Sequence, residues 1–171
     1  GLPPEDLWIL SEFGAVMVQV EGTWMDIDIY TAAQSLKGFG TGIFPGHWLE
    51  MSKYRLDGGD DSVIWTLHRV VRDLLSTMSP ICPFFFHYLS TTLYGSSAVD
   101  VRSFPRLPEL MAPEDATYMR TLTPITSEFN SEVWKAKKDP GLSLKSPISG
   151  IPIPPELSEL RDSMVRMHSI E

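Results

Sequence analysis

Apolar residues recur at three- and four-residue spacing through most of the chain, which is the period of helices that bury one face. The clearest example lies in residues 60–95, where charged positions fall opposite an apolar stripe. This stripe consists of Ile64, Leu67, Val71, Leu74, Leu75 and Met78. A Pro-x-x-Pro elbow follows, and proline both lacks an amide proton and disfavours helical geometry in the preceding residue. We therefore predict a helix that is capped by Asp60 or Asp61 and ends near Ser79, and a second helix over 83–94.

The same period predicts further helices on both sides of this pair. They cover residues 5–20, two pieces within 26–56, residues 113–138 with a break at Pro124, and residues 155–168. The middle of the 26–56 region contains four glycines and one proline. Inside a helix these residues cost about 1 and about 3 kcal/mol each, so we predict a kink there.

The remaining segments divide the chain. An extended piece at 99–104 and a proline-rich link precede the 113–138 region, and short strands are predicted at 148–153 and 169–171. The predicted fold is mainly α. A helical bundle over 1–104 is followed over 105–171 by a C-terminal helix and a small α/β appendage.

Composition limits the class of protein. With 171 residues, 43% of them hydrophobic and 21% charged, the chain can bury a core and is not a disordered tail. No apolar run reaches the roughly 20 residues of a membrane-spanning helix. The first ten residues are acidic where a signal peptide would be basic, so we expect a cytoplasmic protein with no membrane contact. The single cysteine, Cys82, excludes an internal disulfide, and we expect it to be packed.

The charge distribution offers one candidate binding segment. A net charge of −8 argues against a general nucleic-acid binder, because lysine and arginine supply most non-specific affinity. Residues 134–149 differ, with four lysines, one aspartate and a tryptophan, Trp134. The lysines are Lys135, Lys137, Lys138 and Lys145. They can hold phosphates beside a stacking face, or they can simply complement a helix C-terminus, and the residues alone leave both readings open.

Other motifs do not predict a catalytic centre. The segment GFGTGIFPG lacks the third glycine of the dinucleotide fingerprint and is not followed by GK[ST]. The four histidines are scattered, and neither HExxH nor Gly-x-Ser-x-Gly occurs. We therefore expect no metal site and no catalytic residue in this chain.

Several segments, in order, resemble the region that follows the catalytic core in class Ia aminoacyl-tRNA synthetases. LPPEDLWILSEF resembles L-x-x-x-D-x-W-I-L-S, and LKGFGTGIFPGHWLEMSKYRL resembles the bundle helix L-x-x-F-x-W-x-x-F-x-x-x-Y-x-E-x-x-K-x-R-L. The 60–95 stretch and VDVRSFP resemble the next two motifs of the family. KAKKDPGLSLKSPI is similar to K-x-K-x-x-x-G-L-S-L-K-x-P-L of valyl-tRNA synthetases, especially archaeal ones.

This resemblance implies the anticodon-binding helical bundle and small C-terminal piece of a valine–tRNA ligase. Its partners would be tRNA(Val) and the remainder of the synthetase chain, and the protein would be a monomer. ATP and Mg²⁺ would bind in a catalytic core upstream, so no cofactor is expected here. The alternatives are the matching domain of an isoleucyl- or leucyl-tRNA synthetase, and a helical interaction module with no RNA role.

The resemblance also implies RNA-binding residues. Positions near the anticodon loop correspond to Phe44, His47, Trp48 and Leu49. Of these, Phe44 or Trp48 would stack on an unpaired base. Backbone phosphates would be held by Lys53, Arg55, Lys135, Lys137, Lys138 and Lys145.

Overall fold

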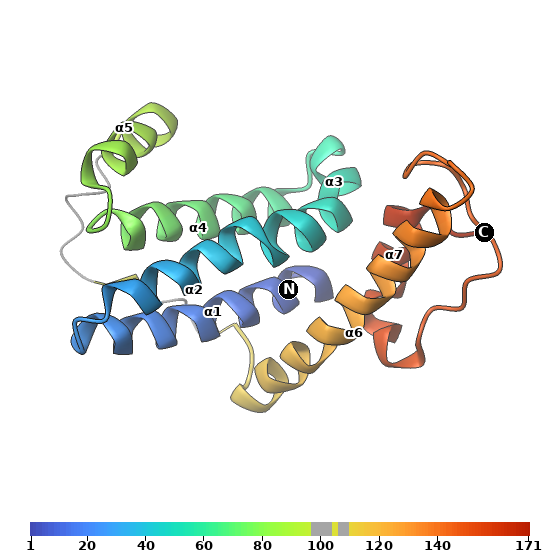
Figure 1. Ribbon diagram of the computed structural model, residues 1–171, viewed down its shortest axis with the longest axis horizontal. Coiled ribbons are helices and arrows are strands. Elements are labelled where there is room, and N and C mark those ends of the chain that lie inside the picture. The colour runs from blue at the N-terminus through green and yellow to red at the C-terminus, as the bar shows by residue number, and fades with distance from the viewer. Residues whose placement is uncertain (97–103, 106–109) are drawn as a thin grey trace.

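The computed structural model describes residues 1–96, 104–105 and 110–171, and these residues fold into helices joined by turns and, over residues 139–154, by a longer irregular segment (Figure 1). In chain order the elements are α1 (Pro4–Met25), α2 (Ile29–Thr41), η1 (Phe44–Leu49), α3 (Glu50–Asp57), α4 (Asp61–Met78), α5 (Pro83–Tyr94), α6 (Pro113–Lys138), η2 (Pro155–Leu160) and α7 (Arg161–His168). The mainly α fold is confirmed. The extended piece predicted at 99–104 and much of the proline-rich link lie outside the described residues.

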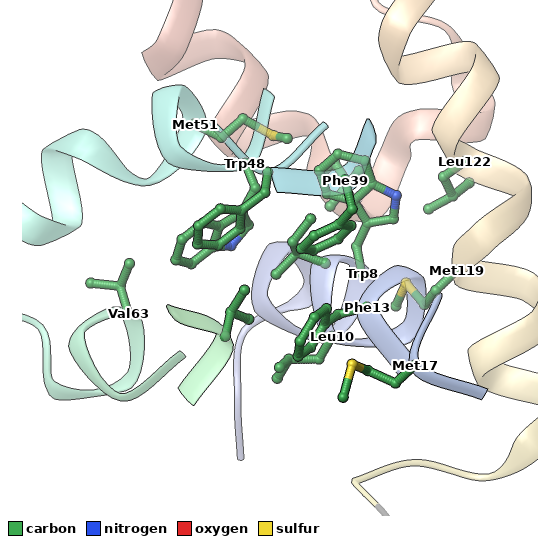
Figure 2. Packing of buried hydrophobic residues seen from close by; sticks show 14 of the residues in the cluster. Trp8, Leu10, Phe13, Met17, Phe39, Trp48, Met51, Val63, Met119 and Leu122 are labelled. Atoms are coloured by element: carbon green, nitrogen blue, oxygen red, sulfur yellow. The ribbon is translucent and has the colours of Figure 1, made fainter. Parts of the chain in front are cut away.

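Helix α1 is the central element of the fold. It packs against α2 and α4 on one side and against α6 on the other, while α5 projects from one end of the molecule and α7 lies at the other (Figure 1). Its buried residues include Trp8, Ile9 and Phe13, which occupy more than one face of the helix. Figure 2 shows Trp8 and Phe13 meeting Phe39 from α2 and Leu122 from α6 in one core.

The predicted kink in the second region is a π-helix. η1 occupies Phe44–Leu49 between α2 and α3 and begins beside Pro45. A side chain at Gly42 would place its Cβ 2.6 Å from the carbonyl oxygen of Gly38. Because that contact is with backbone, only glycine fits at this position without a shift of the chain. The predicted irregularity is confirmed, and it takes the form of a π-helix, whose turns are wider than those of an α-helix.

Helix α4 has the predicted ends, and its buried face overlaps the predicted stripe only in part. Asp60 caps it by accepting a hydrogen bond from the Ser62 amide at 2.8 Å, and α5 ends at Gly95 in the left-handed conformation. The residues it buries are Val63, Thr66, Val70, Leu75 and Thr77. Of the predicted stripe, Leu75 is buried and Ile64 is 37% exposed. The others are half-buried against the core, namely Leu67, Val71, Leu74 and Met78. The predicted burial of Cys82 is also wrong, since the thiol is exposed in the elbow.

The predicted break at Pro124 does not occur. Helix α6 runs without interruption from Pro113 to Lys138, although Pro124 removes one backbone hydrogen bond. Buried residues on both sides of the proline, Leu122 and Phe129, belong to the common core. The Trp8 indole nitrogen also donates to the Thr123 hydroxyl at 2.9 Å, next to the proline. Packing against α1 therefore offsets the local cost.

Replacing Pro124 with alanine is expected to raise the free energy of unfolding by about 1–3 kcal/mol. Pro124 is exposed, so alanine loses little packing and restores a helical hydrogen bond. Urea unfolding measures the change. The control is Pro113→Ala in the same helix, which should not stabilise the chain because proline suits a first turn. Equal effects at both positions would contradict the explanation.

The C-terminal segment contains less β structure than predicted. In the part of the chain that the structure describes, the predicted strands reduce to one isolated parallel bridge between Ile148 and Ile170. Two short helical pieces, η2 and α7, contribute Leu157, Leu160 and Met164 to the same core cluster as α1. The boundary between 1–104 and 105–171 stays a prediction, and the core extends across it.

Candidate nucleic-acid interface

The two aromatic residues predicted to stack on RNA are part of the core. Phe44 stacks between Phe39 and Trp48, with ring centroids 5.6 and 5.1 Å away. Trp48 is 0% exposed, and its indole nitrogen donates to Asp6 Oδ1 at 3.0 Å. The prediction that Phe44 or Trp48 stacks on an unpaired base is therefore contradicted, because the faces of both rings are covered by protein.

Arg55 is also a structural residue. Its guanidinium donates to Glu5 at 2.9 Å, to both carboxylate oxygens of Asp6 at 3.0 and 2.7 Å, to Asp60 at 3.0 Å and to Ser62 at 2.6 Å. Burial alone would lower the pKa of Arg55, but the hydrogen bonds with Asp6 and Asp60 outweigh it and raise this pKa. Hydrogen bonds from Arg55 and Ser62 hold the pKa of Asp60 well below its usual value. The predicted phosphate contact is wrong because five bonds already occupy this cation.

Lys137 is the fourth predicted contact residue that the structure buries, after Phe44, Trp48 and Arg55. Its side chain is 0% exposed, and Nζ donates to the carbonyl oxygens of Leu144 and His168, at 2.7 Å each. Burial lowers the pKa of this amine. The lysine ties the loop after α6 to the end of α7, and it cannot reach a phosphate from there.

A polar network that the sequence did not reveal continues from Lys137. His168 Nε2 lies 2.7 Å from Asn130 Oδ1, and Asn130 Nδ2 lies 2.8 Å from His47 Nδ1. The His47 ring stacks on Trp134 at 5.7 Å between centroids. One signal was available, since Asn130 and Trp134 are four residues apart and so share a face of α6. Their partners on η1 and α7 are too distant in sequence to be read from spacing.

This network predicts a loss of stability in mild acid. Burial, then the nearby charges of Lys137 and His47, lower the pKa of His168 from 6.5 to about 4. Between these values the unfolded chain binds a proton at His168 that the folded chain does not bind. The contribution of His168 to the free energy of unfolding is therefore fully present above pH 6.5 and is lost as the pH drops towards 4. Between pH 7 and pH 5 the loss from this group should be about 2 kcal/mol.

Urea unfolding at both pH values measures this loss. His168→Gln keeps a donor for Asn130 but cannot titrate, so this variant should lose about 2 kcal/mol less than the wild type. His68→Gln serves as the control, because His68 is exposed and makes one hydrogen bond, to Tyr94. An unchanged pH dependence in His168→Gln would contradict the assignment.

The other predicted contacts remain on the surface. Lys53 has a side chain 57% exposed and pairs with Glu50 at 2.5 Å. Lys135, Lys138 and Lys145 are exposed, and His47 and Leu49 are half-buried. Lys138 lies four residues after Trp134, so it follows the His47–Trp134 pair along one side of α6. Contact of these surface residues with RNA stays a prediction. We call the three exposed lysines at positions 135, 138 and 145 the lysine group.

Three further findings bear on what the described part of the chain can bind. Within residues 1–96, 104–105 and 110–171 no cluster of three or more His, Cys, Asp or Glu side chains can hold a metal ion. A groove of about 650 Å³ lies between α1 and the start of α6, lined largely by apolar residues such as Leu10, Val18 and Met111. That lining does not suit a phosphate backbone. No helix in the described part of the chain is long and apolar enough to cross a membrane.

Comparison with known proteins identifies the family. The family described as anticodon-binding domain of tRNA ligase matches residues 6–152. The chain belongs to this anticodon-binding domain family. The resemblance to class Ia synthetases seen in the sequence is thereby confirmed.

Relatives of this anticodon-binding domain point to one group of enzymes. The chain is 29% identical to a valine–tRNA ligase of Nanoarchaeum equitans, over 99% of this chain and 22% of the relative. It is 26% identical to that of Saccharolobus solfataricus, over 84% of the chain and 17% of the relative. It is 29% identical to the valine–tRNA ligase of Methanothrix thermoacetophila, over 89% of this chain and 17% of the relative. The chain thus spans about a fifth of the length of these relatives.

Proposed function

We propose that this chain is the tRNA-binding part of a valine–tRNA ligase, and that it recognises the anticodon region of tRNA(Val). In this role it positions the tRNA for a catalytic core elsewhere in the enzyme. The observation that carries the proposal is the family match over residues 6–152, together with archaeal valine–tRNA ligases as relatives. ATP and Mg²⁺ would act in that core, and this part would carry no catalytic centre of its own.

The surface at the α6 end supports the proposal. The lysine group places three exposed cations on and after the last turn of α6, in a chain whose net charge is −8. Cations concentrated in one place on an acidic protein favour one binding orientation for a phosphate backbone. The His47–Trp134 pair beside them supplies ring surface of the kind that binds unpaired bases.

Binding to tRNA tests the proposal. The purified chain should bind a tRNA(Val) transcript more tightly than an unrelated tRNA of the same length, measured by fluorescence anisotropy. A tRNA(Val) whose anticodon has been exchanged should bind as weakly as the unrelated tRNA. Affinity should fall as salt is added, since counterions are released from the phosphates. Equal affinity for all three RNAs would remove the claim of specificity.

A second candidate function, a helical interaction module, rests on helix α5. This helix projects from the body (Figure 1) and exposes Phe84 (90%), Phe85, Tyr88 and Leu93. An apolar face of this kind marks a contact with protein. The partner of this face would be the remainder of the synthetase chain. We further propose that the whole enzyme is a cytoplasmic monomer. Reversing the charge of the lysine group separates the two functions, because only an RNA-binding role requires it.

A further inference from the structure

Asn130 lies between two imidazole rings and makes one hydrogen bond to each. Its carboxamide oxygen accepts from His168 Nε2 at 2.7 Å, and its amide nitrogen donates to His47 Nδ1 at 2.8 Å. Asn130 and His168 are buried, so water does not compete freely for these bonds. In this arrangement Nδ1 of His47 is an acceptor. The proton of a neutral His47 ring must then be on Nε2.

The neutral state of the network follows from its surroundings. The Lys137 ammonium donates to the His168 carbonyl oxygen at 2.7 Å, and burial with this nearby charge lowers the pKa of His168. Burial also lowers the pKa of His47. Both rings are therefore uncharged at neutral pH, and the two hydrogen bonds of Asn130 require only one proton on each ring.

The free side of the His47 ring is the part that can meet a ligand. The ring is half-buried and stacks on Trp134, and Nε2 forms no hydrogen bond with any residue that the structure describes. The exposed Lys138 lies one helical turn after Trp134. A fixed donor, an aromatic face and a cation thus occur together at the junction of η1 and α6.

We propose that His47 determines RNA specificity: its Nε2–H, set as a donor by Asn130, bonds to an acceptor on an unpaired base of the tRNA. Unpaired bases present such acceptors on their Watson–Crick and Hoogsteen edges. Asn130 and His168 are positioning residues, since they act through His47. The inference rests on the proposed function and adds the residue and the kind of contact.

Substitutions at position 47 test the RNA contact. His47→Phe keeps a ring beside Trp134 but removes the donor, and its affinity for tRNA(Val) should fall about tenfold. His47→Gln keeps an N–H near the position of Nε2 and should bind within about threefold of the wild type. His68→Phe is the matched control, because the exposed His68 also hydrogen-bonds one neighbour and contacts an aromatic ring, that of Tyr94, at 5.7 Å. It should leave binding unchanged.

Nitrogen-15 NMR of the histidine rings tests the positioning without RNA. The wild-type chain should show His47 as the Nε2–H tautomer. Asn130→Asp places only acceptors beside Nδ1, so His47 should change to the Nδ1–H or doubly protonated form. His47 found as Nδ1–H in the wild type overturns the inference, because the Asn130 amide would then have the opposite orientation.

The two proposals fail in different ways. Wild-type binding to tRNA(Val) that His47→Phe leaves intact overturns this inference and leaves the proposed function standing. A wild-type chain that does not prefer tRNA(Val) overturns the proposed function, and the recognition role of His47 with it. In that case the NMR measurement still shows whether Asn130 determines the tautomer of the His47 ring.

Discussion

Replacing Arg55 with alanine is expected to lower the free energy of unfolding by about 3–5 kcal/mol. The substitution leaves Asp6, which is 0% exposed, and the buried Glu5 without the cation that neutralises them. A buried carboxylate without its cation has lost its hydration, and the hydrogen bond that Asp6 keeps from the Trp48 indole does not neutralise its charge. The change also frees Asp60, which caps α4, so α1, α3 and α4 lose a common connection. Urea unfolding at pH 7 measures the loss.

Lys53→Ala is the matched control for Arg55→Ala. Lys53 is on the same helix, and its ion pair with Glu50 is exposed, so the loss should stay within about 0.5 kcal/mol. A double variant, Arg55→Ala with Asp6→Ala, should cost less than the sum of the single changes, since the second change removes a charge that the first left unpaired. Simple additivity would show that the two groups do not interact.

The positions of most helices could be predicted because they depend on local chemistry. Proline and glycine set the ends of α4 and α5, and the glycines before Pro45 marked the irregular turn η1. The residues that α4 buries most deeply were less predictable than its ends. Apolar residues cover a wide arc of this helix, and which of them are buried depends on the helices that pack against it, α1, α2, α3 and α5.

The break expected at Pro124 failed for a related reason. A proline inside a helix has a local cost, but the packing of α6 along α1 is non-local and outweighs it. The strands expected near the C-terminus had only a weak local signal. Ile148 and Ile170 meet at a single bridge, which is too little pairing to define a strand.

The candidate site was only partly predictable, because residue type does not show whether a cation is exposed. Arg55 and Lys137 match the basic positions of the family, yet both are buried and bonded to groups far away in the sequence. Their partners, Asp6 and the carbonyl oxygen of His168, have no sequence signal that ties them to these cations. The sequence did indicate Trp134, because it is an aromatic residue next to several lysines. Its pairing with His47 depends on how η1 meets α6.

Reversing the charge of the lysine group, as Lys135→Glu, Lys138→Glu and Lys145→Glu together, is expected to weaken tRNA binding about a hundredfold at low salt. All three side chains are exposed, so folding should be unaffected, whereas Lys137 is excluded because it is buried. Each lost phosphate contact should also flatten the dependence of log affinity on log salt by about 0.7–0.9. The plot for the variant should therefore be less steep by about 2 to 3.

The matched control reverses three other cations, Lys37, Arg72 and Arg120, and changes the net charge by the same amount. These residues lie on α2, α4 and α6, outside the last turn of α6 and the loop after it. If RNA binds where we propose, this control should lose far less affinity and keep its salt slope. Equal losses in both sets would mean that the acidic body repels RNA without a defined site. Unchanged binding in both sets would mean that the lysines only complement the end of α6, because a phosphate-binding surface cannot tolerate three reversed charges.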